Sequence, residues 1–197
     1  MQLTDNTIFI TGGTSGIGRA LAEAFHKLGN RVIISGRRKA LLEEVTALNP
    51  GMRWVELDIT SPDSIRAAAE HLTREYPDLN VLVNNAGIMP FDDAAGAIDE
   101  ETMLNSVNTN LLGPIRMTAA LIEHLKKQPR AHVVNNSSVL AFVPLATNAV
   151  YSALKAGLHS YTLSQRFMLR DTEENRYEIP DLSALDESSR QKFAGKM

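Results

Sequence analysis

The feature that most constrains the fold of this chain is a glycine-rich segment, residues 12–18, which reads Gly-Gly-Thr-Ser-Gly-Ile-Gly. The β-branched and apolar residues 7–11 before it are typical of a buried strand, and residues 19–28 after it carry apolar side chains at helical spacing. A dinucleotide site requires this order of strand, glycine loop and helix, because glycines let the backbone approach a pyrophosphate and the helix amino end offers free N–H groups. The alternative, a glycine-rich turn that binds nothing, is disfavoured by the two flanking elements.

The chain continues this alternation of strand and helix up to about residue 170. Strands are predicted at residues 31–35, 52–57, 81–84 and 131–136, and helices at residues 39–48, 61–76, 96–128 and 149–169. The helix over 96–128 is expected to be interrupted near Asp99 and kinked or distorted near Pro114. This pattern predicts an α/β fold: a Rossmann-type doubly wound parallel sheet, three-layer α/β/α, as a single domain over residues 1–170. Residues 171–197 break the pattern and form a polar tail that allows a short helix from about Asp186.

Two arginines follow the second predicted strand, where NAD-binding units carry an acidic residue for the ribose 2′-hydroxyl. The residues at this point are Gly36, Arg37 and Arg38. An arginine fork suits a 2′-phosphate, and the missing carboxylate removes a repulsion, so NADP(H) is favoured over NAD(H). A basic helix start that faces solvent is the alternative interpretation.

Further candidates lie at the carboxyl ends of the third and fourth predicted strands, where open parallel sheets bind ligands. Asp58, which precedes Ile59, could accept a hydrogen bond from an adenine amino group or could cap the next helix. The fourth strand is followed by Asn85, Ala86 and Gly87.

Three polar residues near the fifth predicted strand have side chains that carbonyl chemistry can use. Tyr151 and Lys155 are four residues apart and therefore share one face of a helix. A nearby ammonium favours the phenolate and is expected to lower the tyrosine pKa. Ser138 lies far enough before Tyr151 to come from the preceding strand and face the same pocket. Taken alone, Tyr151 and Lys155 could equally be surface residues of an ordinary helix.

The composition excludes several other classes of protein. The 197 residues are 44% hydrophobic and 22% charged, close to globular averages, and the formal net charge of −3 gives no broad attraction to nucleic acid or to an anionic membrane. The chain has no cysteine, which excludes disulfides and thiolate metal sites, and we predict no metal site. Because neither a signal peptide nor a transmembrane stretch is visible, a cytoplasmic protein is expected.

Five motifs together resemble the short-chain dehydrogenase/reductase family, in that family's order and spacing. They are Thr11-Gly12-x-x-x-Gly16-x-Gly18, Asn84-Asn85-Ala86-Gly87, Asn110-Leu111-x-Gly113, Ser138 and Tyr151-x-x-x-Lys155. The resemblance covers the chain up to about Leu169. It implies an oxidoreductase that interconverts a carbonyl compound and its alcohol by hydride transfer, with a small-molecule substrate.

The resemblance also implies a role for each matching residue. Tyr151 would be the general acid or base, and Ser138 would donate a hydrogen bond to the substrate oxygen. Lys155 would hold the nicotinamide ribose and lower the tyrosine pKa, while Asn110 would support a water linked to that lysine. The cofactor would lie against Gly12, Thr14, Ser15, Gly16, Ile17, Gly18, Arg37, Arg38, Asp58, Ile59, Asn85, Ala86, Gly87, Tyr151 and Lys155. Ser15 stands where some NADP-preferring members carry a basic residue, which departs from their pattern.

A sixth strand, a Pro-Gly turn, a substrate lid and a seventh strand, which family members generally have, are not recognisable after about residue 171. Either the natural protein has residues that this sequence omits, or the chain is shortened. The leading prediction is an NADP(H)-dependent oxidoreductase; the rival is a protein that binds the cofactor but has a regulatory or binding role. By resemblance, helices 103–128 and 149–169 could pair across the subunits of a homodimer or homotetramer.

Overall fold

The computed structural model describes residues 2–169, and these contain one sheet of five parallel strands. The strands are β1 (Thr7–Ile10), β2 (Arg31–Gly36), β3 (Arg53–Glu56), β4 (Leu79–Asn84) and β5 (His132–Asn135). Their spatial order is β3-β2-β1-β4-β5, and every neighbouring pair is parallel. The doubly wound sheet predicted from the sequence is therefore confirmed.

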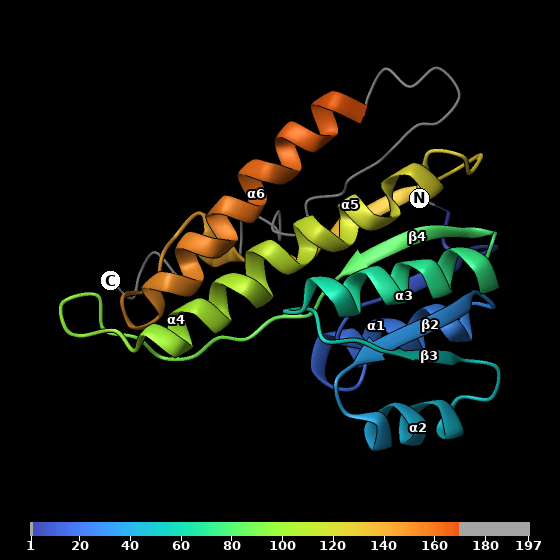
Figure 1. Cartoon of the computed structure of the whole chain (residues 1–197), viewed down its shortest axis with the longest axis horizontal. Helices are drawn as coiled ribbons and strands as arrows, with labels where there is room; N and C mark the ends of the chain where they lie inside the picture. Colours follow the sequence, from blue (N-terminus) through green and yellow to red (C-terminus); the bar gives the residue numbers. More distant parts are fainter. Residues whose placement is uncertain (1, 170–197) are drawn as a thin grey trace.

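The helices cover both faces of this sheet (Figure 1). They are α1 (Gly16–Lys27), α2 (Lys39–Leu48), α3 (Pro62–Glu75), α4 (Glu100–Val107), α5 (Gly113–Leu125) and α6 (Ala149–Leu169). Successive side chains of β1 point to opposite faces of the sheet and pack against different helices. Ile8 and Ile10 pack with side chains of α1 and α2, whereas Phe9 packs with α3 and α5. All three side chains are fully buried, which is why a central parallel strand is a continuous apolar run.

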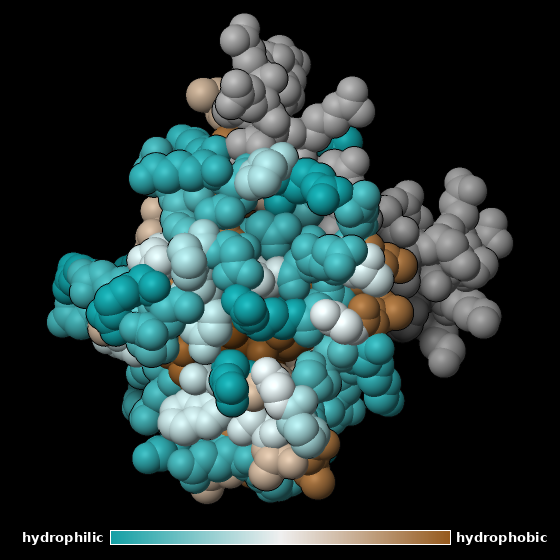
Figure 2. All heavy atoms as spheres, turned by 90° about the vertical axis from the view of Figure 1, so that its right-hand side faces the viewer, coloured by the Kyte–Doolittle hydropathy of each residue, from teal (hydrophilic) through white to brown (hydrophobic). Residues whose placement is uncertain are grey.

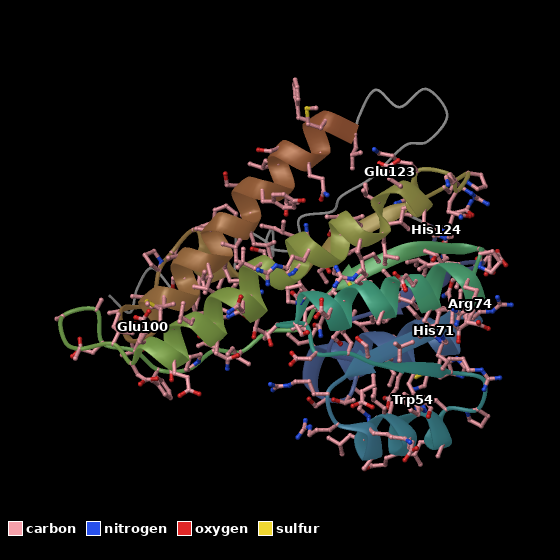
Figure 3. The ribbon with its side chains drawn as sticks, in the orientation of Figure 1. Trp54, His71, Arg74, Glu100, Glu123 and His124 are labelled. Atoms are coloured by element: carbon pink, nitrogen blue, oxygen red, sulfur yellow. The ribbon has the colours of Figure 1, made fainter. Side chains whose placement is uncertain are left out.

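A distorted turn joins α4 to α5, as Pro114 predicts. Residues Asn108–Leu112 form a π-helical turn, and α5 begins at Gly113 directly before the proline. Proline has no N–H and clashes with the carbonyl of the preceding turn, so a wider turn relieves the conflict. The two helices still form one long rod, with Glu100 and Glu123 near its opposite ends (Figure 3), and this rod runs beside α6 (Figure 1).

Several element boundaries differ from those predicted. The helix expected from residue 96 begins at Glu100, because the carboxylate of Asp99 accepts from Thr102 N at 2.7 Å and fixes the start there. Strand β4 begins at Leu79, inside the turn expected over residues 78–80, where Asn80 Oδ1 accepts from Thr7 N at 2.9 Å. The tail over residues 171–197 and its short helix lie outside the described residues.

The surface at the amino ends of the strands is mostly hydrophilic (Figure 2). The β4 arrow in Figure 1 points to the left, and Figure 2 shows the opposite, right-hand side of the molecule, where the strands begin. Within residues 2–169, no helix combines the length and the apolar character that crossing a membrane requires.

Candidate active site

A cleft of about 650 Å³ lies at the carboxyl ends of the strands. The strand order reverses between β1 and β4, and such a reversal opens a crevice in a doubly wound sheet. All the residues predicted to bind the cofactor line this cleft, and so does Ser138. The structure thus brings together Gly12, Thr14, Ser15, Gly16, Ile17, Gly18, Arg37, Arg38, Asp58, Ile59, Asn85, Ala86, Gly87, Ser138, Tyr151 and Lys155. Asn110 is absent from the lining, although its neighbour Thr109 belongs to it.

The glycine loop approaches the end of β4 too closely for side chains. Gly12 has a φ of +70°, and a Cβ at this position would lie 2.9 Å from Ala86 Cα. A Cβ on Gly18 would collide with the Asn85 amide and with the Gly12 carbonyl. The loop then enters α1, whose N-cap Ser15 makes no side-chain capping bond and whose first turn has no acidic residue. A helix start without a side-chain cap, behind a tight glycine loop, fits the pyrophosphate of a dinucleotide.

Thr11 and Asn85 hold the loop against the strand end. Thr11 Oγ1 accepts from the main-chain N–H groups of Asn85 and Ala86, both at 3.0 Å. Asn85 Nδ2 donates to the carbonyls of Thr11 at 3.0 Å and Gly12 at 3.2 Å. Asn85 Oδ1 accepts from Asn136 Nδ2 at 2.9 Å. Sequence reasoning did not assign site roles to Thr11 and Asn136; their signal was a polar residue at or just after the end of a buried strand.

The two arginines after β2 lie on the exposed rim of the cleft. Arg37 precedes α2 and Arg38 is its N-cap residue. Within residues 2–169 neither guanidinium forms an ion pair. Gly36 packs beside Thr14: a Cβ on Gly36 would lie 3.3 Å from Thr14 Cγ2. The rim therefore presents free positive charge next to the loop.

The Asp58 carboxylate orders the turn after β3. Its Oδ1 accepts from the main-chain N and the Oγ1 of Thr60, at 2.9 and 2.7 Å. The next helix, α3, is capped by Ser61, whose Oγ accepts from Ser64 N at 3.3 Å. Ser61, and not Asp58, therefore caps the next helix. Asp58 lines the cleft, where the sequence also allowed it to contact an adenine.

Ser138, Tyr151 and Lys155 all line the cleft. Ser138 follows β5, and its Oγ accepts from Leu140 N at 3.1 Å. The Ser138 side chain lies close enough to the Tyr151 hydroxyl to lower the pKa of the tyrosine. Lys155 Nζ lies 5.6 Å from the centroid of the Tyr151 ring, one helical turn along α6. The spacing of four residues therefore places both side chains on the same face, as expected.

Lys155 is almost completely buried, with 4% of its surface exposed. Its Nζ donates to the main-chain carbonyl of Asn136 at 2.6 Å. Burial disfavours the charged form and lowers the pKa of Lys155 to about 8. The lysine is therefore held in place by a strand end and is easily deprotonated for its residue type.

The pKa of Tyr151 moves in the direction opposite to the one expected from the sequence. Burial raises this pKa, and the nearby Ser138 side chain lowers it by less. Lys155 is not among the groups that shift this pKa, and its ammonium donates to the Asn136 carbonyl. The pKa of Tyr151 is thus raised by burial, where the sequence predicted a lowering by Lys155.

Asn110 lies in the π-helical turn and is fully buried. Its Oδ1 accepts from Ile88 N at 2.9 Å, and its Nδ2 donates to Ile88 O at 2.7 Å. Each polar atom of the amide thus makes a hydrogen bond to Ile88, in the segment after β4. The role of Asn110 in supporting a water linked to Lys155 stays a prediction.

Comparison with known proteins identifies the family to which the chain belongs. The family model for short chain dehydrogenases matches residues 6–173. The chain belongs to the short-chain dehydrogenase/reductase family. It is 41% identical to the uncharacterized oxidoreductase DltE of Bacillus subtilis (98% of this chain, 78% of that protein). It is 38% identical to the serine 3-dehydrogenase of Agrobacterium fabrum (81% of this chain, 64% of that protein).

Other members agree with this assignment. The NADP-dependent 3-hydroxy acid dehydrogenase YdfG of Shigella flexneri is 30% identical, over 95% of this chain and 77% of that protein. The crystal structure of a short-chain dehydrogenase from Streptomyces avermitilis superimposes with a TM-score of 0.82 at 29% identity, over 91% of this chain and 65% of that one. This chain therefore spans about two thirds to four fifths of these relatives. The class of enzyme, an oxidoreductase of CH–OH groups in a family that binds NAD(P), is confirmed.

Proposed function

We propose that this protein is an NADP(H)-dependent oxidoreductase that interconverts a small carbonyl compound and its alcohol. The observation that carries the proposal is the position of Ser138, Tyr151 and Lys155 in the cleft that also contains the glycine loop. NADP(H), when bound, supplies or accepts the hydride. The protein then has to orient the reacting groups and move one proton.

In the proposed reduction, Tyr151 donates its hydroxyl proton to the substrate oxygen, and in the oxidation it accepts that proton. The closeness of the Ser138 side chain to the Tyr151 hydroxyl supports this assignment, because a substrate oxygen placed between the two hydroxyls would contact both. Ser138 would donate to that oxygen and stabilise the charge that develops on it. Lys155 would bind the nicotinamide ribose, for which its buried ammonium has donors besides the one used by Asn136.

The preference for NADP(H) rests on the rim of the cleft. Arg37 and Arg38 offer two guanidinium groups, and Gly36 leaves no carboxylate to bind a ribose hydroxyl or repel a phosphate. The relative named as NADP-dependent supports the same preference. Asp58 and Ile59 would face the adenine, and Ala86 and Gly87 the nicotinamide ribose.

The cleft also offers apolar walls for a substrate, since Met89 and Val139 line it together with Tyr151. Two relatives are named for serine and for 3-hydroxy acids, so 3-hydroxy acids are the first substrate class to test. The experiment is NADPH and NADP⁺ turnover by the purified protein with 3-hydroxy acids, serine, ketones and aldehydes. Cofactor binding without turnover on the whole panel would instead indicate a protein with a binding role.

A homodimer or homotetramer is part of the proposal. The helices α4 and α6 expose apolar side chains, among them Leu104 at 48% and Leu163 at 50%. A symmetric contact between copies would bury such residues. Sedimentation at micromolar concentration tests this, and a monomer alone would contradict it.

A further inference from the structure

The amino end of α6, the helix that carries Tyr151, takes its cap from a distant segment. The first N–H groups of a helix have no partner within the helix, and an Asn, Asp, Ser or Thr just before the helix usually supplies one. Asn148 occupies that place, but its Nδ2 donates to Pro90 O at 2.9 Å and its Oδ1 accepts from Thr147 Oγ1 at 3.1 Å. Its side chain is therefore used for other contacts.

Asp92 supplies the missing acceptors. One carboxylate oxygen accepts from Ala149 N at 2.9 Å, and the other accepts from Val150 N at 3.0 Å. The main-chain N of Asp92 also donates to Thr147 O at 3.0 Å. Asp92 is thus attached by two hydrogen bonds to the start of α6 and by a third to the turn before it, and the two bonds to α6 are made by a charged group, which strengthens them.

The segment that carries Asp92 begins at the end of β4 and is fixed at its other end as well. Ile88 is bonded through both its N–H and its carbonyl to the buried amide of Asn110. Residues 88–92 therefore form a short strap that runs from the π-helical turn to the first turn of α6. Both of its anchoring points are polar contacts made across the fold rather than along the chain.

The capped residues directly precede the proposed proton donor. Tyr151 follows Val150, and a helix rises about 1.5 Å per residue, so loss of the cap would loosen the turn that holds the phenol. A displacement of about 1 Å at a reacting group can lower a rate by about two orders of magnitude. A carboxylate also suits the positive end of the helix dipole.

We infer that Asp92 is a positioning residue for the reaction proposed above, because it caps the catalytic helix from the loop after β4 and so fixes the hydroxyl of Tyr151 relative to Ser138. This inference rests on the proposed function. Asp92 would not touch substrate or cofactor, and it is not among the residues that line the cleft.

The test compares Asp92→Ala, Asp92→Asn and Asp93→Asn in the full chain. Asp93 is the matched control: it is the adjacent aspartate, and its Oδ1 accepts from Ala95 N at 3.0 Å within its own loop. For Asp92→Ala we expect kcat to fall by about tenfold or more, with KM and the NADPH dissociation constant changed by less than about threefold. Asp92→Asn keeps one acceptor oxygen and should be intermediate, and it remains informative if the alanine variant does not fold. Asp93→Asn should match the wild type.

Hydrogen exchange of the peptide covering residues 149–155 gives a readout that does not depend on turnover. It should become faster in Asp92→Ala and stay unchanged in Asp93→Asn. An active wild type with unchanged kcat in both Asp92 variants would overturn the inference and leave the proposed function standing. A wild type inactive on the whole substrate panel would overturn the proposed function, and with it the role of Asp92 in the reaction, whatever the exchange rates.

Discussion

The ammonium of Lys155 donates to the main-chain carbonyl of Asn136 at 2.6 Å, directly after β5. The side chain of the same Asn136 donates to Asn85, which in turn holds the carbonyls of the glycine loop. Asn136, the residue directly after β5, therefore connects the buried lysine with the segment proposed to bind the pyrophosphate.

The burial of Lys155 predicts a pH dependence of stability. Its pKa is about 8 in the folded protein against 10.5 for an ordinary lysine, so between these pH values the unfolded chain binds more protons. Folding stability should thus rise with pH across this window, by up to about 3 kcal/mol from this group. The free energy of unfolding of the wild type should exceed that of Lys155→Met by an amount that increases with pH. The increase should be seen between about pH 7.5 and about pH 10, close to the two ends of this window. The same change at the exposed Lys27 is the control, and an equal pH dependence in both comparisons would contradict the prediction.

Cofactor preference should depend on Arg37. Removing a guanidinium from a phosphate costs about 1.5–3 kcal/mol, so Arg37→Ala should weaken NADPH binding by about 10- to 100-fold. The NADH dissociation constant should change little, because NADH has no 2′-phosphate. Titration calorimetry with both cofactors measures this, with Arg53→Ala, an exposed arginine on β3, as the control. Equal affinities of the wild type for NADPH and NADH would show the preference to be wrong.

A buried row of side-chain hydrogen bonds should stabilise the pairing of β4, β5 and α6. Asn84 Nδ2 donates to Asn135 Oδ1 at 2.8 Å, and Asn135 Nδ2 donates to Thr162 Oγ1 at 2.9 Å. Thr162→Val keeps the shape but leaves the Asn135 amide without its acceptor, which should cost about 1–3 kcal/mol. Ser164→Ala on the exposed side of the same helix should cost less than about 0.5 kcal/mol. Chemical denaturation compares the two, and equal losses would refute this role of the row.

The sequence allowed the layers of the fold to be predicted because their signals are local. The apolar run at residues 7–11, the glycine loop and the helical spacing of residues 19–28 act within a few residues of one another. Pro114 predicted a distorted turn for the same reason, since its ring conflicts with its own preceding turn. The spacing of Tyr151 and Lys155 fixed their common face.

What the sequence did not reveal depends on contacts across the fold. The acceptor for Lys155 is a main-chain carbonyl, and every residue has one, so no pattern distinguishes Asn136. The direction of the Tyr151 pKa shift follows from how deeply α6 packs against the strand ends, which spacing alone does not determine. The cap on α6 likewise comes from Asp92, more than fifty residues earlier in the chain.

Tyr151 is proposed to transfer the proton in an NADPH-dependent reduction. The most direct measurement is the rate of NADPH oxidation by wild type, Tyr151→Phe and Tyr161→Phe on the best carbonyl substrate, together with their NADPH dissociation constants. Tyr161 lies on the same helix outside the cleft and controls for the loss of a hydroxyl. We predict that Tyr151→Phe lowers the rate by about 10²- to 10⁴-fold, with NADPH affinity within about twofold, and that Tyr161→Phe matches the wild type. A Tyr151→Phe protein that oxidises NADPH at the wild-type rate would contradict the account.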